Sequence, residues 1–201
     1  GGISNTGNTC FLAAVLQCLA YAPPLNQALR NGVLHGFHGA CPLAVKGQVC
    51  IACMVEKQLL AILACKRGSA IRPSTLVPNL HLLSKAFRSG RQEDAHELLV
   101  TLLDGVERAS KRALAMLGFK AQHTLIEELF SGQLISQVRC EECGITSNNF
   151  QTLSSLSLDL GRSSNLEGCM AAYSASEILD GANKYQCEKC KRLVRARKSM
   201  A

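Results

Sequence analysis

The first clear pattern of apolar and polar positions begins directly after Cys10. Apolar side chains recur there with the spacing of one face of a helix, at Phe11, Leu12, Val15, Leu16 and Leu19. The pattern predicts a helix that begins at Cys10, has Thr9 as its N-cap and buries one face. We expect this helix to end near Ala20, because residues 21–24 include two consecutive prolines.

Further along the chain, the pattern predicts more helices separated by loops. Residues 25–49 are glycine-rich and are predicted to be irregular. Residues 49–65 are mostly apolar and predict a buried helix. Prolines in residues 69–78 predict a loop, and residues 79–87 predict another short helix.

The longest helical pattern covers residues 92–116. We expect the cap of this helix near Ser89 or Gly90, and its end at Gly118. A short helix around residues 121–130 is predicted to follow.

After Gly132 the spacing changes from helical to the alternation that is typical of strands. Residues 133–139 and 145–153 are both predicted to be extended. A helix-rich front followed by a strand-rich back indicates an α+β fold. We therefore divide the chain (residues 1–201) into a mainly helical part, 1–128, and a β-rich part, 129–201.

Composition limits the classes of protein to which the chain can belong. With 201 residues and 47% hydrophobic content, the chain can form a packed core. The net charge is +7, and much of the surplus lies in residues 189–198. Aromatic residues make up 4% and no groove-reading element accompanies the basic end, which argues against nucleic acid as a partner.

The cysteine content indicates a reducing compartment. The chain has eleven cysteines, and four of them form the C-x2-C pairs Cys140–Cys143 and Cys187–Cys190, a metal spacing and not a disulfide framework. We find no signal peptide and no apolar run long enough to cross a membrane. We therefore expect the cytosol, the nucleus or both, and no membrane partner.

Cys10 stands where a thiol can become a nucleophile. A helix N-terminus presents unpaired backbone N–H groups and the positive end of the helix dipole, and both favour the thiolate. Asn5, on the same loop, can turn its amide toward an oxyanion formed at this thiol. Cysteines are often merely buried, and we interpret Cys18 on the same helix in that way.

The two C-x2-C pairs predict a tetrahedral zinc site. The four candidate ligands are Cys140, Cys143, Cys187 and Cys190. Four thiolates leave no open position, so the zinc would be structural. We expect the insert between the pairs, residues 145–186, to form strands and a helix.

A second cluster of candidate ligands lies in residues 35–53. Zinc could be held there by His38, Cys41, Cys50 and Cys53, with His35 nearby. Buried free thiols at the start of an apolar helix explain these cysteines equally well. Both interpretations stay open at this point.

Polar side chains also gather at the start of the long helix, at Gln92, Asp94, His96 and Glu97. Acidic residues in a first turn complement the helix dipole, so a solvated helix end accounts for Glu93 and Asp94. Histidine followed by an acid and an apolar run is more often structural than a general base. These residues alone do not define a site.

Five segments resemble conserved boxes of the ubiquitin-specific protease family. Residues 2–12, GISNTGNTCFL, and residues 14–19, AVLQCL, resemble its cysteine box. Residues 91–99, RQEDAHELL, resemble its Gln-Asp-x-His-Glu box. Residues 130–134 and 156–160 resemble strands that flank its zinc-binding fingers. The resemblance covers essentially the whole chain.

The resemblance implies a papain-like cysteine protease fold, incomplete at its C-terminus, with Cys10 as nucleophile and Asn5 in the oxyanion hole. It implies that the Gln-Asp-x-His-Glu box lines the cleft for ubiquitin's C-terminus, with Gln92, Asp94, His96 and Glu97 as substrate-binding residues. It places the C-x2-C zinc in a subdomain that grips ubiquitin. Ala13 stands where the family usually has Asn, one turn past the thiol.

The family takes its general base from a later Gly-His-Tyr box, and the sequence contains no such segment. We therefore predict a fragment of a deubiquitinating thiol protease that is inactive alone and acts on ubiquitin and ubiquitinated proteins. Two alternatives stay open. One is a ubiquitin-binding pseudoenzyme, and the other is a zinc-ribbon nucleic-acid-binding module, which the basic end motivates.

Overall fold

The computed structural model describes residues 1–88, 90–120, 123–161 and 163–201. The chain forms two compact units, Gly1–Leu129 and Phe130–Ala201. Among the described residues, no helix combines the length and the apolar character that crossing a membrane requires.

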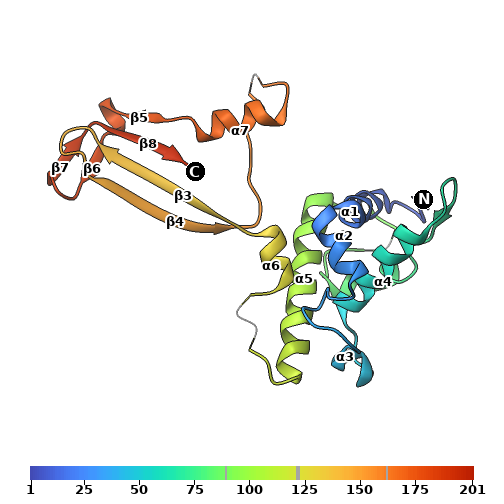
Figure 1. Ribbon diagram of the computed structural model, residues 1–201. Helices are drawn as coiled ribbons and strands as arrows, with labels where there is room; N and C mark the ends of the chain where they lie inside the picture. The colour runs from blue at the N-terminus through green and yellow to red at the C-terminus, as the bar shows by residue number, and fades with distance from the viewer. Residues whose placement is uncertain (89, 121–122, 162) are drawn as a thin grey trace. The chain divides into compact units, whose positions relative to one another are not determined.

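Helices dominate the first unit (Figure 1). Its elements are β1 (Gly2–Ile3), α1 (Cys10–Tyr21), α2 (Pro23–Arg30), α3 (Pro42–Val45), α4 (Ile51–Ala64), β2 (Ala70–Ile71), the 3-10 helix η1 (Val77–Leu82), α5 (Ala95–Met116) and α6 (Leu125–Phe130). β1 and β2 pair in parallel, with Gly2 opposite Ala70. This pairing anchors the chain just before the loop that leads to Cys10.

Helices α1, α4 and α5 pack against one another and form the core of this unit. Each contributes leucines whose side chains are fully buried: Leu12 and Leu16, Leu59, and Leu98 and Leu102. Burying such a side chain contributes about 1.5–3 kcal/mol. The helix that begins at Cys10 is therefore fixed along its buried face, while its first residue is exposed.

Side-chain caps set the first residues of α5 and α6. Asp94 Oδ1 accepts a hydrogen bond from the backbone N–H of Glu97 at 2.8 Å. Before α6, the Thr124 hydroxyl accepts from the Glu127 N–H at 3.2 Å, and Glu127 Oε2 accepts from the Thr124 N–H at 2.7 Å. The second arrangement is a capping box, which satisfies two backbone donors at once.

Several predicted boundaries in the first half were wrong for local reasons. The prolines that end α1 also begin α2, because proline suits the first turn of a helix. Residues 25–49 are therefore not irregular throughout, since α2 continues to Arg30 and α3 follows. The helix predicted at 79–87 is the shorter 3-10 helix η1.

Later boundaries also moved. α5 begins at Ala95 with Asp94 as its cap, so the cap predicted near Gly90 was placed too early. The alternative cap, Ser89, lies outside the described residues, as does Ala121, where the next helix was predicted to start. The described α6 begins at Leu125.

The second unit is built on an antiparallel sheet (Figure 1). Its elements are β3 (Gly132–Cys140), β4 (Thr146–Leu153), α7 (Leu166–Ser174), β5 (Glu177–Leu179), the 3-10 helix η2 (Gly181–Asn183), β6 (Tyr185–Cys187), β7 (Arg192–Val194) and β8 (Ala196–Met200). The strand order is β4-β3-β8-β5, and β6 and β7 form a separate hairpin. The strands predicted at 133–139 and 145–153 are confirmed as β3 and β4, and the insert does contain strands and a helix.

The core of the second unit includes a small cluster around two cysteines. Cys140, Cys187 and Val194 are buried together, and Cys143, Tyr185 and Cys190 pack against them. Strand β4 contributes little to burial, since Phe150 is 55% exposed. So small an apolar cluster suggests that this end of the unit needs a further source of stability.

Candidate functional site

The loop from Asn5 to Thr9 positions Cys10. Gly7 and Asn8 both have positive φ angles, of 105° and 52°. Gly and Asn adopt this left-handed conformation most readily. The loop thereby turns back so that Cys10 becomes the first residue of α1 with its side chain exposed.

Asn5 is held by its own side-chain oxygen. Asn5 Oδ1 accepts hydrogen bonds from the Gly7 N–H at 3.2 Å, the Thr9 N–H at 3.0 Å and the Thr9 hydroxyl at 3.1 Å. Because this oxygen is engaged three times, the orientation of the amide is fixed. The Asn5 Nδ2 group stays available as a donor within the described part of the chain.

Thr9 holds the predicted N-cap position, but its side chain does not cap the helix. Its hydroxyl donates to Asn5 and accepts a hydrogen bond from the Thr6 N–H at 3.0 Å. Thr9 is only 4% exposed, so these bonds satisfy a buried hydroxyl. The residue organises the loop and leaves the backbone donors of the first helical turn free of a Thr9 side-chain bond.

The residues of the Gln-Asp-x-His-Glu box lie at the start of α5, in the same unit as Cys10. Gln92, Asp94, His96 and Glu97 are all exposed. Asp94 caps the helix, so one of its oxygens is engaged. A hydrogen bond from Asn8 Nδ2 to the Gly90 carbonyl, at 2.8 Å, joins the loop before Cys10 to the segment before this box.

Sequence reasoning missed Asn8 as a link between the two boxes. The tolerance of Asn for positive φ was a usable signal for its backbone, but its partner lies 82 positions away in the chain. The interpretation of Cys18 as a core thiol was wrong, because Cys18 is exposed. It lies two turns after Cys10, on the face of α1 opposite the buried leucines.

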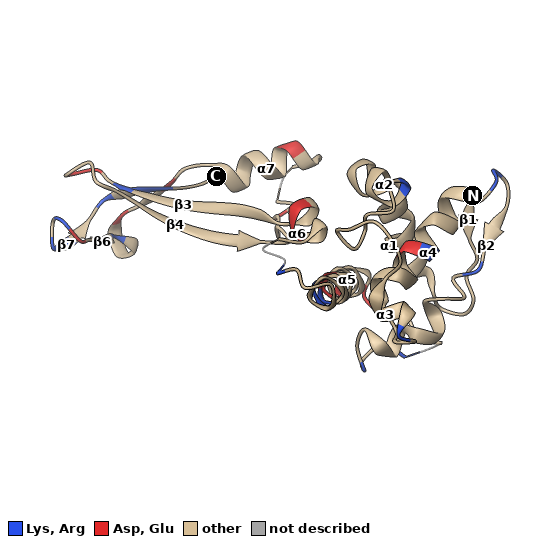
Figure 2. Ribbon diagram, turned by 60° about the horizontal axis from the view of Figure 1, so that its bottom comes forward, with Lys and Arg blue, Asp and Glu red and all other residues tan. Residues whose placement is uncertain are grey.

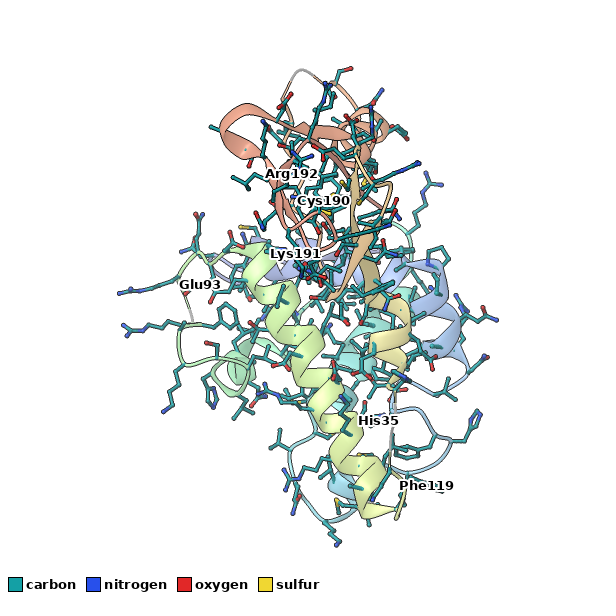
Figure 3. All side chains as sticks on the ribbon, turned by 90° about the vertical axis from the view of Figure 1, so that its left-hand side faces the viewer. His35, Glu93, Phe119, Cys190, Lys191 and Arg192 are labelled. Carbon is teal, nitrogen blue, oxygen red and sulfur yellow. The ribbon has the colours of Figure 1, made fainter. Side chains whose placement is uncertain are left out.

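The four cysteines of the C-x2-C pairs converge in the second unit. Their sulfurs all lie within 4.8 Å of one another, with Cys140 and Cys190 at 3.9 Å and Cys143 and Cys187 at 3.7 Å. A zinc tetrahedron with Zn–S bonds of about 2.3 Å has edges of roughly 3.8 Å. Figure 3 shows sulfur atoms gathered beside the label of Cys190. The donor set and its spacing therefore fit one zinc ion.

Each pair has the same local geometry. The Cys143 N–H donates to Cys140 Sγ and the Cys190 N–H donates to Cys187 Sγ, both at 3.4 Å. Gly144 and Lys191 follow with positive φ angles of 72° and 56°. The Cys143 N–H lowers the pKa of Cys140 to about 7, which favours the thiolate that metal binding requires. Hydrogen bonding with the Cys143 thiol raises the pKa of Cys190 to about 12.

Ion pairs connect the first cysteine pair to the strands that follow the second. Arg192 contacts Glu142 at 2.6 Å, and Arg195 and Arg197 contact Glu141 at 3.1 and 3.5 Å. Basic and acidic residues lie close together around β6 and β7 (Figure 2). Much of the basic charge near the C-terminus is thus matched locally.

The second predicted cluster is also present, with one correction. The converging side chains are His35, Cys41, Cys50 and Cys53. His38, which we predicted as the imidazole ligand, is exposed and is not part of the group. His35 is only 6% exposed and contacts Cys50 and Cys53. Spacing alone did not distinguish two histidines that lie three positions apart.

Comparison with solved structures identifies the fold. The SAGA DUB module of Ubp8, Sgf11, Sus1 and Sgf73, bound to monoubiquitin, aligns with a TM-score of 0.78 at 21% identity, over 100% of this chain and 44% of that chain. The same module bound to ubiquitin aldehyde aligns with a TM-score of 0.77 over the same shares. The chain therefore has the α+β fold of these solved structures over the region that aligns.

Sequence comparison then identifies the family. The family model described as ubiquitin carboxyl-terminal hydrolase matches residues 1–190. The chain belongs to the ubiquitin carboxyl-terminal hydrolase family.

Relatives in Arabidopsis thaliana and Schizosaccharomyces pombe have similar levels of sequence identity to this chain. Ubiquitin carboxyl-terminal hydrolases 23 and 25 of Arabidopsis thaliana are each 37% identical, over 99% and 100% of this chain. Probable ubiquitin carboxyl-terminal hydrolase 16 of Schizosaccharomyces pombe is 36% identical over 99% of it. The chain spans 23%, 31% and 43% of these three relatives.

Proposed function

We propose that the chain carries the nucleophile of a deubiquitinating thiol hydrolase, which cleaves the peptide or isopeptide bond after the C-terminal Gly of ubiquitin. The observation that carries this proposal is the exposed Cys10 thiol at the first residue of α1, beside an Asn5 amide whose oxygen is fully engaged. Family membership supplies the reaction class, and the loop geometry supplies residues for it.

In the proposed reaction, the Cys10 thiolate attacks the carbonyl carbon of ubiquitin's C-terminal Gly. The oxyanion that forms accepts hydrogen bonds from Asn5 Nδ2 and from the Cys10 backbone N–H. Its collapse expels the amine, which takes up a proton, and leaves a thioester on Cys10. Water then hydrolyses the thioester, releases ubiquitin and restores the thiol.

This reaction also needs a base that takes the thiol proton and returns it to the leaving amine. Among the five histidines, His35 is buried with Cys50 and Cys53, and His96 is part of the α5 box. We assign the base to none of the five. We propose that it comes from a further segment of the protein, and that this chain alone does not turn over substrate.

The α5 box is the proposed contact for the extended C-terminus of ubiquitin. The carboxylates of Asp94 and Glu97 suit basic and backbone N–H groups, and Gln92 and His96 add donors and acceptors. The Asn8–Gly90 hydrogen bond connects the segment that precedes this box to the loop that precedes Cys10. The box and the loop before Cys10 are thereby linked within one unit.

We propose that the site of Cys140, Cys143, Cys187 and Cys190 holds structural zinc and stabilises a subdomain that grips the body of ubiquitin. Four sulfurs close the coordination shell, so the ion would serve folding and not catalysis. The ion pairs of Arg192, Arg195 and Arg197 argue against the nucleic-acid module, because they reduce the basic charge free to meet phosphates.

One paired experiment tests this function. Binding of monoubiquitin to the full-length protein is measured by calorimetry, beside hydrolysis of ubiquitin that carries a C-terminal fluorogenic amide. The hydrolase account predicts both binding and cleavage, with cleavage lost in Cys10→Ser and binding retained. Binding without cleavage would favour the pseudoenzyme, and the absence of both would overturn the proposal.

A further inference from the structure

We propose that His35, Cys41, Cys50 and Cys53 bind a second structural zinc ion, in the helical unit and independent of the C-x2-C site. The four candidate ligand atoms all lie within 4.8 Å of one another. His35 Nε2 is 3.3 Å from Cys50 Sγ and also 3.3 Å from Cys53 Sγ. This inference goes beyond the proposed hydrolase function and does not depend on it.

The distances suit a tetrahedral ion. With Zn–S bonds of about 2.3 Å and Zn–N bonds of about 2.0–2.1 Å, the edge between nitrogen and sulfur is roughly 3.6 Å. The observed 3.3 Å separations need only small side-chain adjustments to reach it. Three thiols and one imidazole form a Cys3His set, which is one of the usual structural zinc sets.

The cluster is too polar and too deeply buried to be explained simply as part of the hydrophobic core. His35, Cys41 and Cys50 are 6%, 8% and 4% exposed. A buried imidazole needs specific partners, and here one ring nitrogen faces two sulfurs. Burial lowers the pKa of His35, so the ring is neutral, which is the form that binds metal.

The other nitrogen of His35 faces a carboxylate, the kind of group that often orients a zinc-ligating imidazole. His35 Nδ1 lies 3.8 Å from Glu56 Oε2, on α4 one turn after Cys53. A carboxylate behind a ligating imidazole fixes the ring and its tautomer, with Nδ1–H toward the carboxylate and Nε2 toward the metal. The His35 ring therefore lies between the Glu56 carboxylate, on its Nδ1 side, and the sulfurs of Cys50 and Cys53, on its Nε2 side.

All three thiols lie at helix N-termini. Cys50 is the N-cap of α4 and Cys53 lies in its first turn, while Cys41 is the N-cap of α3. The thiol of Cys41 is hydrogen-bonded by the backbone N–H groups of Ala44 and Leu43, which lower its pKa despite the opposing effect of burial. Burial raises the pKa of Cys50 and, together with the neighbouring Cys50 thiol, that of Cys53, so these two thiols would give up their protons when the ion binds.

A disulfide is the competing explanation for two neighbouring cysteines. Cys50 and Cys53 are both free thiols, and a bond between them would leave Cys41 and the His35 nitrogen without a shared partner. A single ion satisfies all four groups at once. The metal therefore accounts for more of the cluster than a disulfide does.

The proposed ion has a clear structural consequence. It would join residues 35–41, which lie between α2 and α3, to the start of α4. Helix α4 packs on α1, whose first residue is Cys10. Binding free energy at this site would thus stabilise the scaffold of the nucleophile.

Zinc stoichiometry tests the proposal on the whole chain. We expect two zinc ions per chain by native mass spectrometry and elemental analysis, and one in His35→Ala. His38→Ala is the matched control, because His38 is exposed and outside the cluster, and it should keep two. A single ion in the unmodified chain that disappears on Cys140→Ser, or two ions retained in His35→Ala, would overturn the proposal.

A second variant guards against loss of zinc through misfolding. His35→Cys replaces the imidazole with a fourth thiolate and should keep two ions. After cobalt substitution its sulfur-to-cobalt charge-transfer absorption should be stronger than that of the unmodified chain, because one more sulfur binds metal. An unchanged cobalt spectrum together with two bound ions would show that position 35 is not a ligand.

Discussion

The side-chain amide of Asn8 donates a hydrogen bond of 2.8 Å to the backbone carbonyl of Gly90. Both residues have positive φ angles, of 52° and 80°. The bond joins the loop before the nucleophile to the segment before α5, within the helical unit. Two segments far apart in the sequence are thereby held in a fixed relation, and reactivity of Cys10 should depend on it.

Replacing Asn8 tests this link. Asn8→Ala removes the hydrogen bond and leaves a residue that adopts positive φ less readily, at a total cost of roughly 1–2 kcal/mol. Asn8→Gly removes the same bond but tolerates the backbone angle, so it should destabilise less. Urea denaturation measures both variants. Equal stability of both variants and the unmodified chain would show that the link is not formed in solution.

The Asn5–Thr9 contact predicts a graded effect on catalysis. In the full-length enzyme, Asn5→Ala should lower kcat by a factor of about 10²–10³, as loss of an oxyanion donor does. Thr9→Val removes the hydroxyl that holds Asn5 Oδ1 and should lower kcat less. Thr9→Ser keeps the hydroxyl and is the control. A Thr9→Val variant with unchanged kcat would show that Thr9 does not position the Asn5 amide.

Loss of the C-x2-C zinc should unfold the second unit. Cys187→Ser removes one ligand, and structural zinc in small zinc-finger peptides contributes about 10–16 kcal/mol. Hydrogen exchange should then show lost protection in β3 and β8, with protection retained in α1 and α5. Cys169→Ser changes another buried cysteine of the same unit, outside the cluster, and should leave β3 protected. Equal protection of β3 in both variants would contradict this account.

Acid should weaken the junction of α5 and α6. The Thr124 N–H, and secondly the Lys111 ammonium, lower the pKa of Glu127. A carboxyl with a lowered folded-state pKa stabilises the fold above its unfolded pKa, and this contribution is lost as pH falls through the folded value. Glu127→Gln should therefore cost about 0.5–1 kcal/mol at pH 7 and much less at pH values well below about 4.

Denaturation of this variant at both pH values measures the difference. Glu128→Gln, at an exposed neighbour, is the control and should cost less at pH 7. If Glu127→Gln lowers the free energy of unfolding by the same amount at both pH values, the ionised form of Glu127 does not contribute to stability.

Local chemistry made much of the fold predictable. The apolar spacing after Cys10 predicted α1, because it has the period of a helix. The alternation after Gly132 predicted β3, because a period of two residues is typical of a strand. The start of α5 was misplaced because a glycine turn and an Asp cap lie close together, and Asp94 provided the cap. Pro23 signals both the end of one helix and the start of the next.

The candidate sites were predictable in their residue types but not in every partner. The C-x2-C spacing alone predicted the grouping of Cys140, Cys143, Cys187 and Cys190. The choice of His35 over His38 depends on which side chain the fold buries, and Asn8 depends on Gly90 far along the chain. Such tertiary contacts leave no periodic signal in a single sequence.

The central claim is that Cys10 is the nucleophile, and covalent capture tests it most directly. The full-length protein is incubated with ubiquitin that carries a C-terminal electrophile, and intact mass is recorded. Cys18→Ser is the matched control, because Cys18 is an exposed thiol on the same helix. The account predicts one ubiquitin adduct on the unmodified protein and on Cys18→Ser, and none on Cys10→Ser. An adduct that persists in Cys10→Ser, or no adduct on the unmodified protein, would contradict it.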